Sequence, residues 1–201
     1  MVLSYGRLSA EKGVVTLIEA WRALALPPER GVLVLAGPTP VDPEVAAALA
    51  TLPEGSHRLL DARRDVVPLL HAADLVVMAS QLPEAFGRVL IEGMSTARPV
   101  VGTAVGGVPE VLSGEFARLL VRPGDAGELA ERIGSVLDWR TDDPGLGERC
   151  RRSVEQRFPY DEHVDALEAV LLAHRRRRSR AGRRPQGARA GQGGRRAGQP
   201  S

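Results

Sequence analysis

Short runs of consecutive apolar residues alternate with amphipathic stretches along most of the chain. The apolar runs do not alternate with polar residues, which is typical of strands that are covered on both faces. They lie at 2–5, 32–36, 58–60, 74–79, 99–102 and 117–121. The amphipathic stretches carry apolar residues at helical spacing. They lie at 14–26, 43–52, 65–73, 88–97 and 125–137.

This alternation of strands and helices, joined by short Gly- and Pro-containing connections, predicts a parallel sheet with helices on both faces. Because the crossovers in such sheets are right-handed, the pattern predicts an α/β, Rossmann-like fold. After residue 137 the strand pattern stops, and 144–158 and 160–174 are predicted to form two closing helices. Residues 175–201 are rich in Arg, Gly, Gln and Pro without apolar periodicity, which predicts a disordered tail after one domain at 1–174.

The charge is unevenly distributed along the chain. Ten of the 27 basic residues lie in 175–201, which holds none of the 25 acidic residues, so 1–174 carries a net charge of −8. An acidic body excludes a folded nucleic-acid binder with a basic face, and we expect no nucleic-acid partner. Binding of the arginine-rich tail to nucleic acid or to an anionic membrane surface is an alternative that composition alone does not support.

The chain has one cysteine, Cys150, so it cannot form an internal disulfide. No apolar run approaches the ~18 residues that a membrane span requires. The first residues also lack the basic segment and long apolar stretch of a signal peptide. From these features we expect a cytoplasmic protein.

Candidate chemistry lies in the loops after the strands, because ligands of parallel sheets bind beyond the carboxyl ends of the strands. The segment GRLSAEKG places Arg7 and Lys12 before a helix that starts near Gly13. Two cations and a helix N-terminus favour a phosphate or diphosphate site. A solvated loop is the alternative, although Lys12 is the single lysine of an arginine-rich chain.

The segment after the fourth strand holds two glutamates eight positions apart, Glu84 and Glu92. A helix is predicted to begin near Gly87, so the N–H groups of Phe86, Gly87 and Arg88 form a second anion cradle. Glu84 would reach a sugar hydroxyl and Glu92 a ribose diol. Alternatively, Glu84 caps the helix and Glu92 is solvated.

Gly106 and Gly107 follow the fifth strand and are followed by Val-Pro-Glu, which predicts a flexible turn and a short helix that closes the same crevice. Together these segments resemble the retaining glycosyltransferases of family 4, which have the two-domain GT-B fold. The resemblance covers about 2–172. Its motifs are GRLSAEKG (6–13), EAFGRVLIE (84–92), RPVVGTAVGGVPEVL (98–112), LLVRPGD (119–125) and RFPY (157–160).

The resemblance implies the donor-binding half of a hexosyl-type glycosyltransferase that retains anomeric configuration. Arg7 and Lys12 would hold the diphosphate of a nucleotide-sugar, and Glu84, with the backbone of Phe86 and Gly87, would hold the sugar. The implied catalytic residues are Glu84, Arg7 and Lys12, while Glu92 would bind the ribose. There is no Asp-x-Asp motif, so neither a metal nor another cofactor is expected.

One departure from the family pattern concerns Arg98, where relatives usually have glycine. At a helix-to-strand turn this predicts a strained residue with positive φ, at a cost of about 1 kcal/mol.

An N-terminal, acceptor-binding half is the other expected partner. Either the chain is a fragment, which we favour, or that half is a separate polypeptide. A non-catalytic nucleotide or nucleotide-sugar binding module is the alternative function, and an epimerase of the same two-domain fold is a weaker one.

Overall fold

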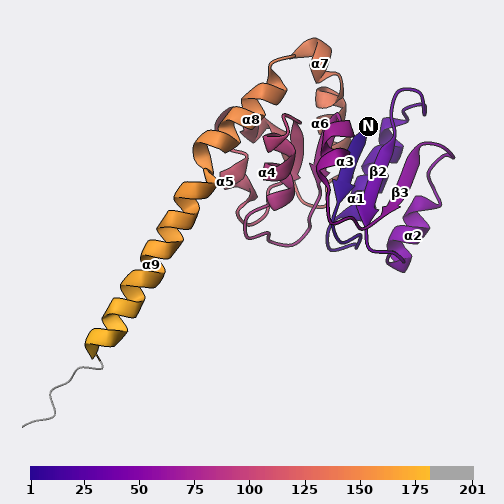
Figure 1. Cartoon of the computed structure of the whole chain (residues 1–201). Helices are drawn as coiled ribbons and strands as arrows, with labels where there is room; N and C mark the ends of the chain where they lie inside the picture. Colours follow the sequence, from indigo (N-terminus) through magenta and orange to yellow (C-terminus); the bar gives the residue numbers. More distant parts are fainter. Residues whose placement is uncertain (182–201) are drawn as a thin grey trace, which may run out of the picture. The chain divides into compact units, whose positions relative to one another are not determined.

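The computed structural model describes residues 1–181 (Figure 1). The chain divides into two units, Met1–Phe158 and a second that begins at Pro159. The first unit contains one sheet of six strands, all parallel, in the order β3-β2-β1-β4-β5-β6. The strands are β1 (Val2–Tyr5), β2 (Leu33–Gly37), β3 (His57–Asp61), β4 (Leu75–Met78), β5 (Val100–Thr103) and β6 (Leu120–Val121). This order is that of a doubly wound Rossmann sheet, so the predicted fold class is confirmed.

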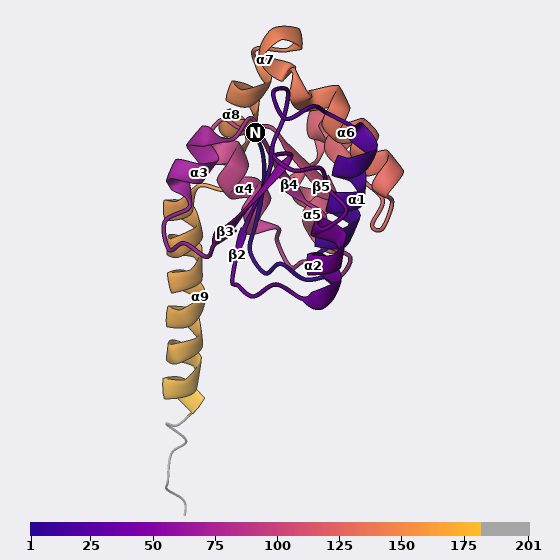
Figure 2. The ribbon, with the colours of Figure 1, turned by 90° about the vertical axis from the view of Figure 1, so that its right-hand side faces the viewer.

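Helices cover both faces of the sheet. Those of the first unit are α1 (Val14–Leu24), α2 (Pro43–Leu49), α3 (Val67–Ala72), α4 (Arg88–Ser95), α5 (Val108–Val111), α6 (Ala126–Leu137), α7 (Trp139–Asp142) and α8 (Leu146–Arg157). Figure 2 shows α1, α2 and α6 on one side of the sheet and α3, α4 and α8 on the other. Described by itself, the second unit contains α9 (Tyr160–Ala181).

The core is mostly aliphatic, because only 3% of the residues are aromatic. Strands β2, β4 and β5 are buried along their whole length, and Leu3 of β1, Val76 and Val101 are fully buried. Both tryptophans also satisfy their indole N–H groups: Trp21 donates to the carbonyl of Ser56 at 3.0 Å, and Trp139 to that of Asp74 at 2.9 Å. These hydrogen bonds connect helices to the residues just before β3 and β4, and they leave neither indole N–H group unpaired in the core.

Two predicted strands differ from the structure. β3 was expected to be covered on both faces, but it is an edge strand of the sheet and exposes Arg58 and Leu59, the latter by 40%. The predicted strand 117–121 is reduced to Leu120–Val121, because a 3-10 helix occupies Gly114–Leu119. The short helix α7 was not predicted.

The end of the last helix also differs from the prediction. Helix α9 was predicted to end at residue 174, but it continues to Ala181. The remainder of the predicted disordered tail, 182–201, lies outside the described residues. No helix in the described part of the chain is both long enough and apolar enough to cross a membrane.

The strain predicted at Arg98 lies one residue earlier, at Ala97, where φ is 57°. Helix α4 ends in a Schellman arrangement in which Ala97 donates to the carbonyl of Met94 and Arg98 to that of Gly93. Arg98 is instead used as a cap for α3: its guanidinium donates to the carbonyls of Leu70 at 3.2 Å and His71 at 2.8 Å. The departure from glycine therefore has a structural function.

Candidate functional site

A cavity of about 510 Å³ opens at the carboxyl ends of β1 and β4, where the strand order reverses. We call it the switch-point cleft. Its walls are the loop between β1 and α1, the loop between β4 and α4, and the start of α4. All six of the predicted site residues line it, namely Arg7, Lys12, Glu84, Phe86, Gly87 and Glu92. The carboxyl-end rule therefore brings together residues that are up to 85 positions apart.

Lys12 and Glu84 form an ion pair across the cleft, with 31% and 22% of their side chains exposed. The hydroxyl of Ser80 donates to the same Glu84 oxygen, Oε1, at 2.9 Å. Burial alone would raise the pKa of Glu84, but the hydrogen bonds from Lys12 and Ser80, with the charges of Lys12 and Arg7, lower it below the usual value. Glu84 is therefore ionised at neutral pH and does not act as a capping group for α4.

Arg7 is exposed and forms no ion pair within the described chain. Its charge nevertheless acts on Glu84, as the lowered pKa of that carboxyl shows. Arg7 and Lys12 thus flank one end of the cleft, which has the positive charge that an anionic group requires.

The loops that carry these residues are held by close backbone contacts. Gly13 adopts a φ of 69°, and a Cβ there would overlap the carbonyl oxygen of Ala79. The backbone N–H of Gln81 also donates to the carbonyl of Glu11 at 2.9 Å, and its side chain donates to Thr16 at 2.8 Å. The loops after β1 and β4 are therefore joined directly to each other.

The glycine pair after β5 packs against the backbone of the Glu84 loop. Gly107 donates its N–H to the carbonyl of Glu84 at 2.8 Å. A Cβ on Gly107 would lie 2.5 Å from the carbonyl oxygen of Ala85, and one on Gly106 would overlap the backbone of Glu84. Glycine is needed at both positions for this approach. The turn after β5 thus supports the Glu84 loop, but neither glycine lines the switch-point cleft, so the predicted closure of the crevice by this turn stays a prediction.

Gly87 is the N-cap residue of α4 and has a φ of 74°. Among the described residues, the backbone N–H groups of Phe86, Gly87 and Arg88 have no acceptor, so they remain available as donors at the cleft. The Phe86 ring is 44% exposed and meets Phe158 edge to face, with ring centroids 5.2 Å apart and an interplanar angle of 87°. The last residue of the first unit therefore supports the loop that holds these donors.

Glu92 lies one turn into α4, with 32% of its side chain exposed. The Tyr5 hydroxyl donates to its Oε2 at 2.6 Å, and the Arg88 guanidinium approaches Oε1 at 3.2 Å. Burial and the neighbouring carboxylate together raise the pKa of Tyr5. The carboxylate of Glu92 is therefore held by the protein and is not simply solvated.

Tyr5 and Ser80 were not among the predicted site residues. Tyr5 is the last residue of β1, and Ser80 follows the end of β4 by two positions. Both therefore lie at the carboxyl ends of strands, where ligands of parallel sheets bind, but the prediction named residues of the loops and α4 only.

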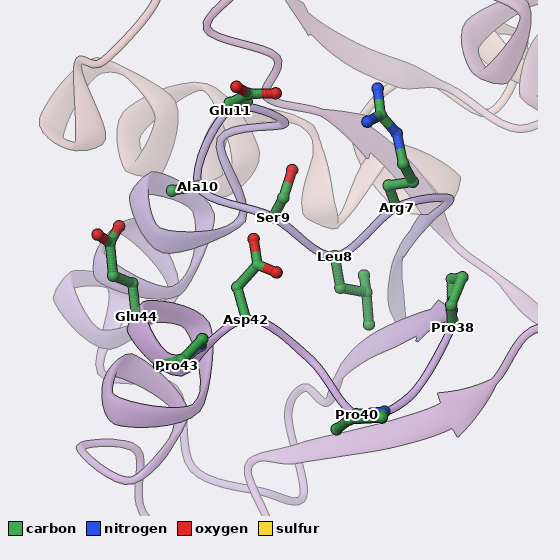
Figure 3. Close-up of a pocket in the computed structure, with 10 residues that line it drawn as sticks. All are labelled: Arg7, Leu8, Ser9, Ala10, Glu11, Pro38, Pro40, Asp42, Pro43 and Glu44. Carbon is green, nitrogen blue, oxygen red and sulfur yellow. The ribbon is translucent and has the colours of Figure 1, made fainter.

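A second cavity, of about 660 Å³, lies between the β1–α1 loop and the segment 37–45 (Figure 3). Arg7 and Leu8 line both cavities. Asp42, Glu11 and Glu44 place carboxylates around it in Figure 3. Within the described residues no cluster of His, Cys, Asp or Glu suited to a metal ion is present.

The fold and cleft define a Rossmann-like α/β domain with a cavity lined by charged residues at its switch point. A family described as "Glycosyl transferases group 1" matches residues 1–138, and the chain belongs to this family, which is family 4. The chain forms one half of a GT-B fold, as the structural comparisons show.

Two curated relatives illustrate the match. A D-inositol 3-phosphate glycosyltransferase of Mycolicibacterium smegmatis is 32% identical over 174 residues, which cover 83% of this chain and 38% of that protein. A glycogen synthase of Mycobacterium tuberculosis is 31% identical over 188 residues, covering 87% of this chain and 43% of that protein. The chain spans less than half the length of these relatives.

Among solved structures, Anabaena HepE in complex with UDP and glucose superposes with a TM-score of 0.76 at 28% identity, over 86% of this chain and 48% of HepE. HepE has also been solved in complex with UDP-glucose. A glycosyltransferase from Rickettsia africae has a TM-score of 0.74 at 24% identity, over 85% of this chain and 47% of that protein, and shows the same fold.

Proposed function

We propose that the chain is the donor-binding half of a retaining glycosyltransferase, which transfers a hexosyl-type sugar from a nucleotide-sugar to an acceptor. The observation that carries this proposal is the switch-point cleft, in which three cations, two carboxylates and, among the described residues, three unpaired N–H donors line one cavity. The nucleotide complexes of HepE support a nucleotide-sugar as the ligand class.

In this proposal Arg7 and Lys12 bind the diphosphate. Charge builds up on the diphosphate as the bond to the sugar breaks, and fixed cations in a partly closed cleft stabilise that charge. An ammonium group has three donors, so Lys12 can bind a phosphate oxygen while it keeps Glu84 as a partner. No step in this scheme requires a metal ion.

Glu84 accepts hydrogen bonds from sugar hydroxyls, and the N–H groups of Phe86 and Gly87 donate to the other end of the sugar. Because Ser80 and Lys12 both contact Oε1 of Glu84, the second carboxylate oxygen remains available to the ligand. Glu92 accepts from the ribose hydroxyls further along the cleft. Glu84, Arg7 and Lys12 are then the catalytic residues.

Transfer also needs an acceptor site, which a second Rossmann-like half supplies in the GT-B fold. We propose that this half, either on the same polypeptide or on a separate one, closes the cleft and excludes water. The acceptor is a hydroxyl compound that this half selects.

Thermal unfolding of the full chain with UDP, GDP, ADP and their sugar conjugates tests the proposal. A ligand at a hundred times its Kd stabilises by about 2.7 kcal/mol, which is a shift of several degrees for a chain of this size. Lys12→Ala and Arg7→Ala should each weaken nucleotide binding by about 1.5–3 kcal/mol. Arg151→Ala, which removes an exposed arginine of α8, is the matched control and should leave binding unchanged.

Substitutions of the two glutamates distinguish binding of the nucleotide end of the ligand from binding of its sugar end. Glu92→Ala should weaken every nucleoside diphosphate, whereas Glu84→Ala should weaken the sugar conjugates alone. Equal effects of Glu84→Ala on free nucleotide and conjugate would contradict its placement against the sugar. Binding of the conjugate without hydrolysis or transfer, even in the presence of the second half, would favour a non-catalytic binding module.

A further inference from the structure

The carboxylate of Glu92 has two donors of different character. Tyr5, the last residue of β1, donates its hydroxyl to Oε2 at 2.6 Å. Arg88, one turn before Glu92 in α4, approaches Oε1 with Nε at 3.3 Å and Nη2 at 3.2 Å. The first contact joins residues 87 positions apart, from the central strand to a covering helix, while the second lies within one helix.

The two contacts differ in how firmly they can orient the carboxylate. The side chain of Arg88 is 84% exposed, and an exposed ion pair between residues four apart in a helix contributes little. Tyr5 is half-buried, and a tyrosine has only two side-chain torsions, so its hydroxyl is a fixed donor. The orientation of the Glu92 carboxylate is therefore set mainly from β1.

Tyr5, Arg88 and Glu92 also stand at a junction between two cavities. They line the switch-point cleft and, in addition, a smaller cavity of about 350 Å³ that continues toward Arg63 and Arg64. A ligand that runs from the diphosphate end of the cleft into this smaller cavity passes the Glu92 carboxylate. The orientation of this one group consequently affects both parts of the path.

We propose that Tyr5 is a positioning residue that directs the carboxylate of Glu92 toward the vicinal diol of a ribose. This inference rests on the proposed function. Among the described residues Oε2 accepts from Tyr5, which leaves one acceptor site on that oxygen for a ligand hydroxyl. Both Arg88 contacts fall on Oε1, and because the Arg88 side chain is 84% exposed, a second ligand hydroxyl can replace it there. Two parallel acceptors match the two hydroxyls of a diol, and a carboxylate that is already oriented loses less freedom on binding.

The test is a double-mutant cycle of Tyr5→Phe and Glu92→Ala in the full chain. Isothermal titration would use UDP, GDP or ADP, whichever binds the wild type, and the 2′,3′-dideoxy form of the same nucleotide. Tyr5→Phe keeps the ring and removes only the hydroxyl. Tyr160→Phe is the matched control, because the Tyr160 side chain is 78% exposed on α9. The unfolding midpoint of each variant verifies that it is folded.

We expect Tyr5→Phe to weaken the ribonucleotide about five- to tenfold, which is less than the loss of a direct hydrogen bond to a charged group, because Tyr5 acts on the ligand through Glu92. Tyr5→Phe should leave the affinity for the dideoxy nucleotide at the wild-type value. In the Glu92→Ala background, Tyr5→Phe should have no further effect on nucleotide affinity. A simply structural role would weaken both nucleotides equally.

The inference is overturned if Tyr5→Phe weakens the dideoxy form as much as the ribonucleotide, or if its effect is the same in the presence and absence of Glu92. In both cases nucleotide binding persists, and the proposed function stands. Failure of the wild type to bind any of the three nucleotides would overturn the proposed function and this inference together.

Discussion

Replacing Gly107 by alanine tests whether backbone packing between two loops holds Glu84 in the cleft. The φ of Gly107 is −81°, so alanine fits the backbone conformation and the added Cβ is the only perturbation. That Cβ would lie 2.5 Å from the carbonyl oxygen of Ala85, whereas real Cβ atoms stay beyond about 3.0 Å. The two loops must then separate by at least about half an ångström.

The expected cost follows from two contributions. Overpacking of this kind costs about 1–3 kcal/mol. The separation also weakens the 2.8 Å hydrogen bond from Gly107 to the carbonyl of Glu84, which is worth about 0.5–1.5 kcal/mol. The lower entropy of an unfolded chain with alanine offsets about 0.4–1 kcal/mol. We expect a net loss near 2 kcal/mol, or about 4–8 °C in Tm.

Urea unfolding followed by circular dichroism measures this loss, and titration with a sugar nucleotide measures its effect on the site. Affinity for the conjugate should fall more than affinity for the free nucleotide, because Glu84 moves with its loop. Gly127→Ala is the control: it lies in the first turn of α6, and its added Cβ would meet only Asp125 at 3.5 Å. That variant should gain up to about 1 kcal/mol. If Gly107→Ala also became more stable and bound the conjugate normally, the packing argument would be refuted.

Three further changes test other contacts of the first unit. Phe158→Ala removes the edge-to-face contact with Phe86 and should lower the free energy of unfolding by at least about 1 kcal/mol. It should also lower the affinity for the sugar conjugate, and Phe158→Leu should restore part of both losses. Arg98→Lys keeps the charge but loses both bonds to the end of α3, which should cost about 1–2 kcal/mol in urea unfolding. Because the pKa of Glu84 is lowered on folding, its stabilisation is complete above the ordinary glutamate value of about 4.3 and is lost as the pH falls through the folded value. Glu84→Gln should therefore flatten the fall in Tm on acidification below about pH 5, and an unchanged pH profile would contradict the Lys12 pairing.

The sheet and the location of the cleft could be predicted from the sequence because both depend on local patterns. Buried parallel strands are continuous apolar runs, and their carboxyl ends share one edge of the sheet whatever the details of packing. Arg7, Glu84 and Glu92 therefore line the same cavity, as the alternation of strands and helices had predicted. The prediction that β3 is covered on both faces was wrong, because an apolar run does not indicate whether a strand is central or at the edge of the sheet.

The hydroxyl donors of the two glutamates could not be predicted in the same way. Whether Tyr5 points toward α4 or away from it depends on the register and twist of β1 against β4, which no local pattern records. The positive φ assigned to Arg98 was wrong for a similar reason. It depends on the residue at which α4 ends, and the helix closes at Ala97. Errors of one residue at helix ends are enough to move strain and capping from one side chain to its neighbour.

The pairing of charges in the cleft has a consequence for how a nucleotide-sugar is recognised. Each glutamate has a hydroxyl donor from the end of a strand and a cation nearby: Ser80 and Lys12 for Glu84, and Tyr5 and Arg88 for Glu92. In the proposed function a diphosphate would share Lys12 with Glu84, whereas Arg7 forms no ion pair among the described residues and would be available to the diphosphate alone. Sharing Lys12 lowers the affinity for the phosphates, but the contacts to Glu84 and Glu92 keep both carboxylates oriented. In the proposed site, selection among anionic ligands then depends on the hydroxyl groups that the two carboxylates bind, and not on the charge of the ligand alone.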